Sequence, residues 1–183
     1  MRTVWPFTYN VITCNSCRLS SRKVVSFDGD EMSYRVGDNV ECKLVKVTDA
    51  LATVEKMAAE SQEIVAPFDI VFVDADKTRL EEYADVFLAN DSLLKPGGLM
   101  IVDNVLWKGG VLEQTGADLS EITDDLQDDD QSKKSRRARR LAGYMHKFNQ
   151  YIVNDPRGET LILPIRDGLS IIRKKKQIDG NCE

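Results

Sequence analysis

The chain has 183 residues, of which 42% are hydrophobic and 30% are charged, and its net charge is -5. This length and composition predict one globular domain with a sizeable core. The net charge argues against a nucleic-acid-binding protein, because phosphate binding needs a basic face. No run approaches the roughly 20 apolar residues of a membrane-spanning helix. The cysteines are expected to be reduced, and the absence of a secretory signal predicts a cytoplasmic location.

The N-terminal part of the chain contains two predicted strands and one predicted helix. Residues 1–22 show little periodicity and remain unassigned. Residues 23–28 form a short apolar run that ends in an acid, and residues 40–47 largely alternate apolar and polar side chains, so both segments predict strands. Thr48 or Asp49 is a suitable N-cap for the helix that follows, which carries apolar residues along one face.

Two apolar runs in the middle of the chain each end in acids. Residues 70–73 run into Asp74, and residues 99–102 run into Asp103 and Asn104. Apolar, β-branched runs are typical of parallel strands that are buried on both faces. Ligands of open α/β sheets bind beyond the carboxyl ends of the strands, so these side chains would converge on a cation if the strands were neighbours. Alternatively, the acids only cap a helix or form a turn.

The remaining elements alternate between helix and strand. Apolar residues recur at helical spacing over residues 80–94, and residues 95–98, Lys-Pro-Gly-Gly, predict a turn into the next strand. Residues 159–165 and 169–173 flank an Asp-Gly pair, which predicts a hairpin. This alternation predicts a doubly wound α/β sheet closed by the hairpin.

A block of charge separates the two halves of this pattern. Acidic residues gather over residues 124–130 and basic residues over 133–140. One interpretation is a basic patch for nucleic acid or an acidic partner. The other is a solvated loop that leads into a helix, and the adjoining opposite charges and the lack of aromatic residues among the basic ones favour it.

Three parts of the sequence resemble one family. Residues 68–77, FDIVFVDADK, resemble the fourth strand of the cation-dependent O-methyltransferases of the catechol and caffeoyl-CoA type. Residues 95–107 are similar to the fifth strand of that family and the loop after it. Residues 148–149, 155–157 and 163–169 are similar to its closing helix and hairpin.

The resemblance implies a Rossmann-like, S-adenosylmethionine-dependent methyltransferase sheet, mainly parallel with a C-terminal antiparallel hairpin. This domain would span residues 23–176, with a charged insertion at 113–140, between the unassigned residues 1–22 and a tail at 177–183. The first strand of the family and its Gly-rich turn are missing from the sequence pattern, unless an unrelated segment supplies the strand. An empty central position would leave main-chain groups unpaired, which favours a homodimer or association with a related chain.

The resemblance also implies a catalytic site. Asp74, Asp103 and Asn104 match the metal ligands of the family, and oxygen ligands suit Mg²⁺, Ca²⁺ or Mn²⁺. Lys77 matches the general base, although a solvated surface lysine is the alternative.

Four further residues match positions around the methyl donor and the acceptor. Asp76 matches the position that holds S-adenosylmethionine, and Ala50 matches the loop that lines its adenine. Asp28, at the end of its strand, is expected to accept the ribose hydroxyls. Trp107 borders the acceptor and could stack on an aromatic ring, although a lone tryptophan is more often packed in the core.

Together these roles predict an enzyme, an S-adenosylmethionine- and divalent-cation-dependent O-methyltransferase. It would transfer a methyl group to a hydroxyl of a catechol-like or phenolic small molecule. The missing Gly-rich turn favours a second hypothesis, a non-catalytic truncated paralogue that binds a cation or pairs with a complete relative. Neither nucleic acid nor a membrane is an expected partner.

Overall fold

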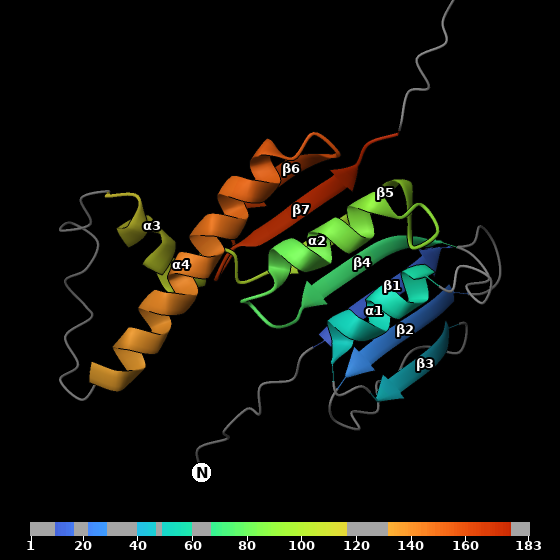
Figure 1. Cartoon of the computed structure of the whole chain (residues 1–183), viewed down its shortest axis with the longest axis horizontal. Helices are drawn as coiled ribbons and strands as arrows, with labels where there is room; N and C mark the ends of the chain where they lie inside the picture. The colour runs from blue at the N-terminus through green and yellow to red at the C-terminus, as the bar shows by residue number, and fades with distance from the viewer. Residues whose placement is uncertain are drawn as a thin grey trace, which may run out of the picture.

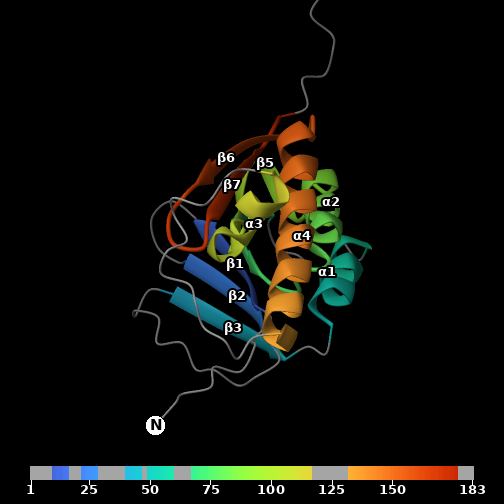
Figure 2. The same cartoon turned by 90° about the vertical axis from the view of Figure 1, so that its left-hand side faces the viewer.

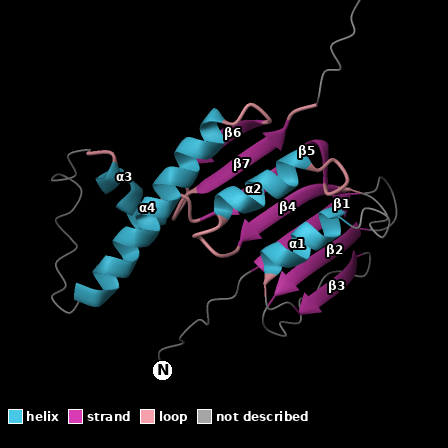
Figure 3. Cartoon of the chain, viewed as in Figure 1, coloured by secondary structure: helices cyan, strands magenta, loops and turns pink. Residues whose placement is uncertain are grey.

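A seven-stranded sheet runs through the part of the chain that the computed structural model describes, which is residues 10–16, 22–28, 40–46, 49–59, 67–116 and 132–176. Its strands are β1 (Asn10–Ser16), β2 (Arg22–Asp28), β3 (Val40–Lys46), β4 (Phe68–Asp74), β5 (Leu94–Asp103), β6 (Gly158–Leu163) and β7 (Leu169–Lys174). The helices are α1 (Ala50–Ala59), α2 (Leu80–Ala89), α3 (Gly110–Gln114) and α4 (Ser132–Asn154), and η1 (Trp107–Gly109) is a 3₁₀ turn. Figures 1 and 3 show these elements.

The strand order is β3-β2-β1-β4-β5-β7-β6. β2 pairs with β3, and β4 with β5, in parallel, whereas β1 is antiparallel to both of its neighbours and β7 is antiparallel to β5 and β6. β2, β3, β4, β5 and β6 therefore share one direction, and β1 and β7 run against it. The predicted α/β sheet with a closing hairpin is confirmed. The sheet is mixed and not mainly parallel as predicted, because the reversed β1 pairs antiparallel with both of its neighbours.

The central strand comes from the segment that the sequence left unassigned. β1 pairs with β4 from Asn10 opposite Asp74, and with β2 from Val11 opposite Phe27. Residues 17–21 alone separate β1 from β2, and a parallel connection needs roughly a dozen residues or more, so the pair is antiparallel. Of the two expectations for the first strand, the structure shows the second: a segment outside the family pattern supplies it, and β4 is paired on both sides.

Helix α1 begins as predicted, with Asp49 as its cap. The Asp49 Oδ1 accepts a hydrogen bond from the main-chain N–H of Ala52 at 3.1 Å, which satisfies a free N–H of the first turn. The Arg79 Nη1 donates to both carboxylate oxygens of Asp49, at 3.1 and 3.0 Å. The Ala52 N–H and then Arg79 lower the pKa of Asp49. This ion pair ties the start of α1 to the start of α2.

Two predicted boundaries between α2 and β5 are wrong. The helix predicted over residues 80–94 ends at Ala89, because the backbone becomes extended at the next residue. The turn predicted over residues 95–98 lies inside β5, as an irregularity in its pairing with β4. A Cβ at Gly98 would lie 2.9 Å from the Lys95 carbonyl oxygen and 3.0 Å from that of Asp69, so this irregularity needs glycine.

The long helices lie on one face of the sheet. Figure 2 shows α1, α2 and α4 on the same side of the strands. Along β4, Val71 and Val73 are fully buried, whereas Ile70 and Phe72 on the other face are half-buried. Among the described helices, α1, α2 and α4 pack on the sheet, and they cover the face of Val71 and Val73. The prediction of strands buried on both faces is therefore right for this face of β4 and wrong for the other.

The basic part of the charge block forms the first half of α4. The side chains of residues 136–140 are exposed on this helix, whereas residues 124–130 lie outside the described part of the chain. The exposure fits the interpretation as a solvated loop that leads into a helix, but the basic residues form the start of the helix and not the loop before it. No helix among the described residues is long and apolar enough to cross a membrane.

A polar cluster around Arg157 joins α2, α4 and the start of β6. The Arg157 Nε donates to Asp155 Oδ1 at 3.0 Å, and its Nη2 donates to Asp85 Oδ1 at 2.6 Å and to the Tyr151 hydroxyl at 2.8 Å. The Tyr151 hydroxyl itself donates to Asp85 at 2.6 Å. Burial and then this bond raise the pKa of Tyr151 to about 12. Chiefly through its hydrogen bond, Arg157 lowers the pKa of Asp155, which is only 8% exposed.

Replacing Arg157 with alanine is expected to lower the free energy of unfolding by about 3 kcal/mol at pH 7, because it leaves the buried Asp155 carboxylate unpaired. A carboxyl with a lowered folded-state pKa stabilises the fold above its unfolded-state pKa, near 4, and this stabilisation is lost as the pH falls through the folded-state value. The loss in Arg157→Ala should therefore be smaller at pH 3 than at pH 7. Urea denaturation at both pH values measures this difference.

The control for this prediction is Arg173→Ala. Arg173 pairs with Glu159 on the surface, where both side chains are more than half exposed, and such pairs contribute about 1 kcal/mol or less. Equal losses of stability in the two variants would show that the Arg157 cluster contributes no more than a surface ion pair.

Candidate functional site

The predicted acids come together at one edge of the sheet. Asp28, Asp74 and Asp103 are the last residues of β2, β4 and β5, which run in the same direction. In Figure 1 the arrowheads of β2 and β4 lie at the same edge, while β1 points the opposite way. β1 enters this edge with Asn10, which is paired with Asp74. The last residues of three strands thus lie at the carboxyl edge, beside the first residue of a reversed strand.

Lys77 links the ends of the two central parallel strands. Its Nζ donates to Asp74 Oδ1 at 2.7 Å and to the main-chain carbonyl oxygen of Asp103 at 3.0 Å. The Lys77 side chain is 11% exposed. Lys77 is therefore not a solvated surface lysine, and its Nζ lies between the ends of β4 and β5.

Asp103 and Asn104 form a tight turn after β5. The Asn104 N–H donates to Asp103 Oδ1 at 2.7 Å, and the Trp107 N–H donates to the Asn104 carbonyl at 3.1 Å. Asn104 has a φ of 64°, in the left-handed region that asparagine tolerates better than most residues. The alternative interpretation as a turn is confirmed. The turn does not exclude cation binding, because a carboxylate has about four acceptor positions and the turn uses one of those of Asp103.

The available ligands fit a hard divalent cation. Asp74, Asp103 and Asn104 offer only oxygen atoms, and two of the three carry negative charge, which suits Mg²⁺, Ca²⁺ or Mn²⁺. No group of three or more His, Cys, Asp or Glu side chains that could hold a metal ion occurs among the described residues. A cation site at this edge would therefore depend on the amide oxygen of Asn104 as its third protein ligand.

The residues predicted to bind S-adenosylmethionine lie at the same edge. Asp76 follows β4, and its Oδ1 accepts hydrogen bonds from the Thr78 N–H at 3.0 Å and from the Thr78 hydroxyl at 2.8 Å. Ala50 is the first residue of α1 and is 7% exposed. Asp28 ends β2, beyond β1 from Asp74. Asp76 thus shapes the turn into α2 as well as lining the edge.

Trp107 packs against the core. It is half-buried at the start of η1 and contacts the main hydrophobic cluster. Its main-chain N–H also donates to the carbonyl of Asp167 at 3.2 Å. The alternative of a packed tryptophan is confirmed, whereas a contact between Trp107 and the acceptor stays a prediction.

The hairpin between β6 and β7 supports the turn after β5. The Leu106 N–H donates to the Asp167 carbonyl at 2.8 Å. Gly168 has a φ of 87°, and a Cβ there would lie 2.5 Å from Leu106 Cγ. The sequence identified Asp167 and Gly168 as a hairpin turn, but it did not predict that this turn holds the loop next to the candidate metal ligands.

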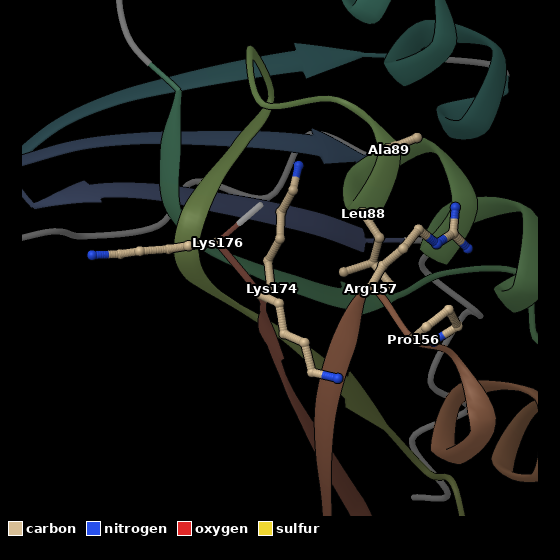
Figure 4. A pocket seen from close by; sticks show the side chains of 7 residues that line it. Leu88, Ala89, Pro156, Arg157, Lys174 and Lys176 are labelled. Carbon is tan, nitrogen blue, oxygen red and sulfur yellow. The ribbon is translucent and has the colours of Figure 1, made fainter. Parts of the chain in front are cut away.

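A separate pocket of about 570 Å³ opens at the opposite edge of the sheet, as Figure 4 shows; it is lined by Leu88, Ala89, Pro156, Arg157, Lys174, Lys175 and Lys176. The buried Lys174 Nζ donates to the carbonyls of Phe87 and Leu94 and pairs with Asp91. In Figure 4 the side chains of Arg157 and Lys176 point in different directions. Lys174 and Arg157 are thus already paired, and no ligand is assigned to this pocket.

The O-methyltransferase family matches residues 29–175 of the chain, which is well over half of its length. The chain belongs to the O-methyltransferase family. The resemblance found in the sequence is thereby confirmed.

The relatives agree with this assignment. The chain is 27% identical over 159 residues to "Flavonoid 3',5'-methyltransferase" of Vitis vinifera, a match that covers 83% of the chain and 60% of the relative. It is 27% identical over 161 residues to "Caffeoyl-CoA O-methyltransferase 2" of Populus trichocarpa, with coverages of 84% and 58%. The chain thus spans less than two thirds of the length of these curated relatives.

The fold also matches a solved methyltransferase. The SAH-bound methyltransferase PaMTH1 of Podospora anserina superposes with a TM-score of 0.57 at 28% identity, over 77% of the chain and 51% of that protein. The Rossmann-like fold of S-adenosylmethionine-dependent methyltransferases is therefore confirmed.

Proposed function

We propose that this member of the O-methyltransferase family transfers a methyl group from S-adenosylmethionine to a hydroxyl of a catechol-like or phenolic small molecule, with the help of a divalent cation. The observation that carries the proposal is the contact of Lys77 with both Asp74 and Asp103 at the carboxyl edge. Relatives named for flavonoids and for caffeoyl-CoA support the phenolic class of acceptor.

Each part of the edge has a role in this proposal. Asp74, Asp103 and Asn104 would hold the cation, which, when bound, lowers the pKa of a hydroxyl and fixes its position. Lys77 would take the proton from that hydroxyl as a general base, from its place beside Asp74.

The methyl donor would lie across the neighbouring strand ends. Asp28 would accept the ribose hydroxyls, Ala50 would line the adenine, and Asp76 would help to hold the sulfonium compound near Lys77. S-adenosylmethionine supplies the reactive methyl group when it is bound.

The direction of β1 favours a second candidate, a non-catalytic paralogue that binds a cation or pairs with a complete relative. Because β1 enters the carboxyl edge at Asn10, it cannot be followed there by a Gly-rich turn that contacts the amino-acid end of S-adenosylmethionine. Each charge-assisted hydrogen bond of such a turn is worth roughly 1.5–3 kcal/mol. The loss of several would weaken binding of the methyl donor by orders of magnitude.

Calorimetric titration of S-adenosylmethionine into the purified chain, with and without Mg²⁺, separates the two candidates. The methyltransferase is expected to give saturable heat with the methyl donor in the presence of Mg²⁺. The non-catalytic paralogue is expected to bind Mg²⁺ but to give no heat with the methyl donor. Adenosine serves as the control ligand, because it tests the end of β2 at Asp28 and the start of α1 at Ala50 without the amino-acid half.

A further inference from the structure

A side chain of α4 holds the loop that follows the candidate metal ligands. The Asn149 Nδ2 donates to the main-chain carbonyl of Val105 at 2.8 Å, across 44 positions of sequence. The Asn149 Oδ1 is buried and has no hydrogen-bond partner among the described residues. An unpaired buried acceptor is unfavourable, so the stability of the fold by itself does not explain an asparagine here.

Val105 is fixed through both of its main-chain groups. Its N–H donates to the Gly168 carbonyl at 3.2 Å, and its own carbonyl accepts from Asn149. The peptide group before Val105 is thereby held by the hairpin, and the one after it is held by α4 through the Val105 carbonyl and by the hairpin through the Leu106 N–H. Asn104 comes directly before Val105 and has a φ of 64°, a conformation that persists only where its surroundings enforce it.

We propose that Asn149 is a positioning residue for the cation site. By holding the Val105 carbonyl, it acts together with the hairpin to fix the backbone that follows Asn104, and hence the direction in which the Asn104 amide oxygen leaves β5, relative to Asp103 and Asp74. This inference rests on the proposed function, in which Asn104 is a metal ligand. Groups that orient metal ligands in this way typically change metal affinity about 10- to 100-fold when they are replaced.

The test measures the melting temperature of the purified chain at increasing concentrations of Mg²⁺, with no other ligand present. Asn149→Leu removes the donor at similar volume and exchanges one unpaired buried acceptor, the Asn149 Oδ1, for another, the Val105 carbonyl, so its melting temperature without cation is expected to stay near that of the wild type. The Mg²⁺ concentration at half of the thermal response is expected to rise about 10- to 100-fold. Asn149→Ala is the second variant, in case leucine disturbs the packing of α4.

Asn154→Leu is the matched control, because Asn154 lies on the same helix and its Nδ2 donates to the exposed Gln150 carbonyl at 2.7 Å. Its Mg²⁺ midpoint is expected to equal that of the wild type. A wild-type midpoint in Asn149→Leu overturns the inference and leaves the proposed function standing, and failure of both Asn149 variants to fold also overturns it. A wild-type chain without any Mg²⁺ response overturns the proposed cation site and the inference with it.

Discussion

Replacing Asp103 with alanine is expected to abolish the stabilisation that Mg²⁺ gives to the folded chain. A ligand that binds only the folded state at 100 times its dissociation constant stabilises it by about 2.7 kcal/mol, which raises the melting temperature of a domain of this size by roughly 5–10 °C. Asp103 ends β5, its own main-chain carbonyl accepts from Lys77, and its side chain contributes one of the two negative charges of the proposed site. Thermal melts with increasing Mg²⁺ measure the effect.

Two controls separate the charge of Asp103 from its part in the turn. Asp103→Asn retains an oxygen that can accept from the Asn104 N–H, as Asp103 Oδ1 does now, but it removes the negative charge, so a weakened response is expected. Glu113→Ala removes an exposed carboxylate on α3 and should leave the Mg²⁺ response unchanged. A full Mg²⁺ response in Asp103→Ala would exclude Asp103 as a ligand.

Replacing Lys77 with alanine is expected to reduce methyl transfer to the rate seen without protein. A general base contributes about 10²- to 10⁴-fold to a proton-transfer step, and Lys77 is the lysine held between the ends of β4 and β5. The wild-type chain by itself is expected to transfer slowly, because the reversed β1 provides no Gly-rich turn for the methyl donor. A labelled methyl donor, Mg²⁺ and a panel of catechols measure the rate.

Lys77→Arg is the matched control for this experiment. Arginine retains the positive charge and a donor for Asp74, but it cannot be deprotonated, so this variant should fold normally and be as inactive as Lys77→Ala. Activity in Lys77→Arg would contradict the role as base. Rapid wild-type transfer that Lys77→Ala abolishes would exclude the non-catalytic paralogue, whereas Mg²⁺ binding without any transfer would support it.

Local sequence patterns were enough to predict the strands that bear the acids. β4 and β5 are apolar runs with a sharp polar end, and this pattern alone places Asp74 and Asp103 at strand ends, with Asn104 directly after the second strand. Asp49 as a helix cap and the Asp167-Gly168 turn were predictable for the same reason, because caps and tight turns depend on only a few adjacent residues.

The tertiary structure alone decided how these pieces combine. The short run in Asn10–Ser16 has no periodicity that gives its direction, and it became an antiparallel central strand because its link to β2 is too short for a crossover. The contacts of Lys77 with Asp103 and of Asn149 with Val105 join residues 26 and 44 positions apart. Sequence spacing does not encode such contacts, because they depend on strand order and register, which the packing of the whole sheet determines.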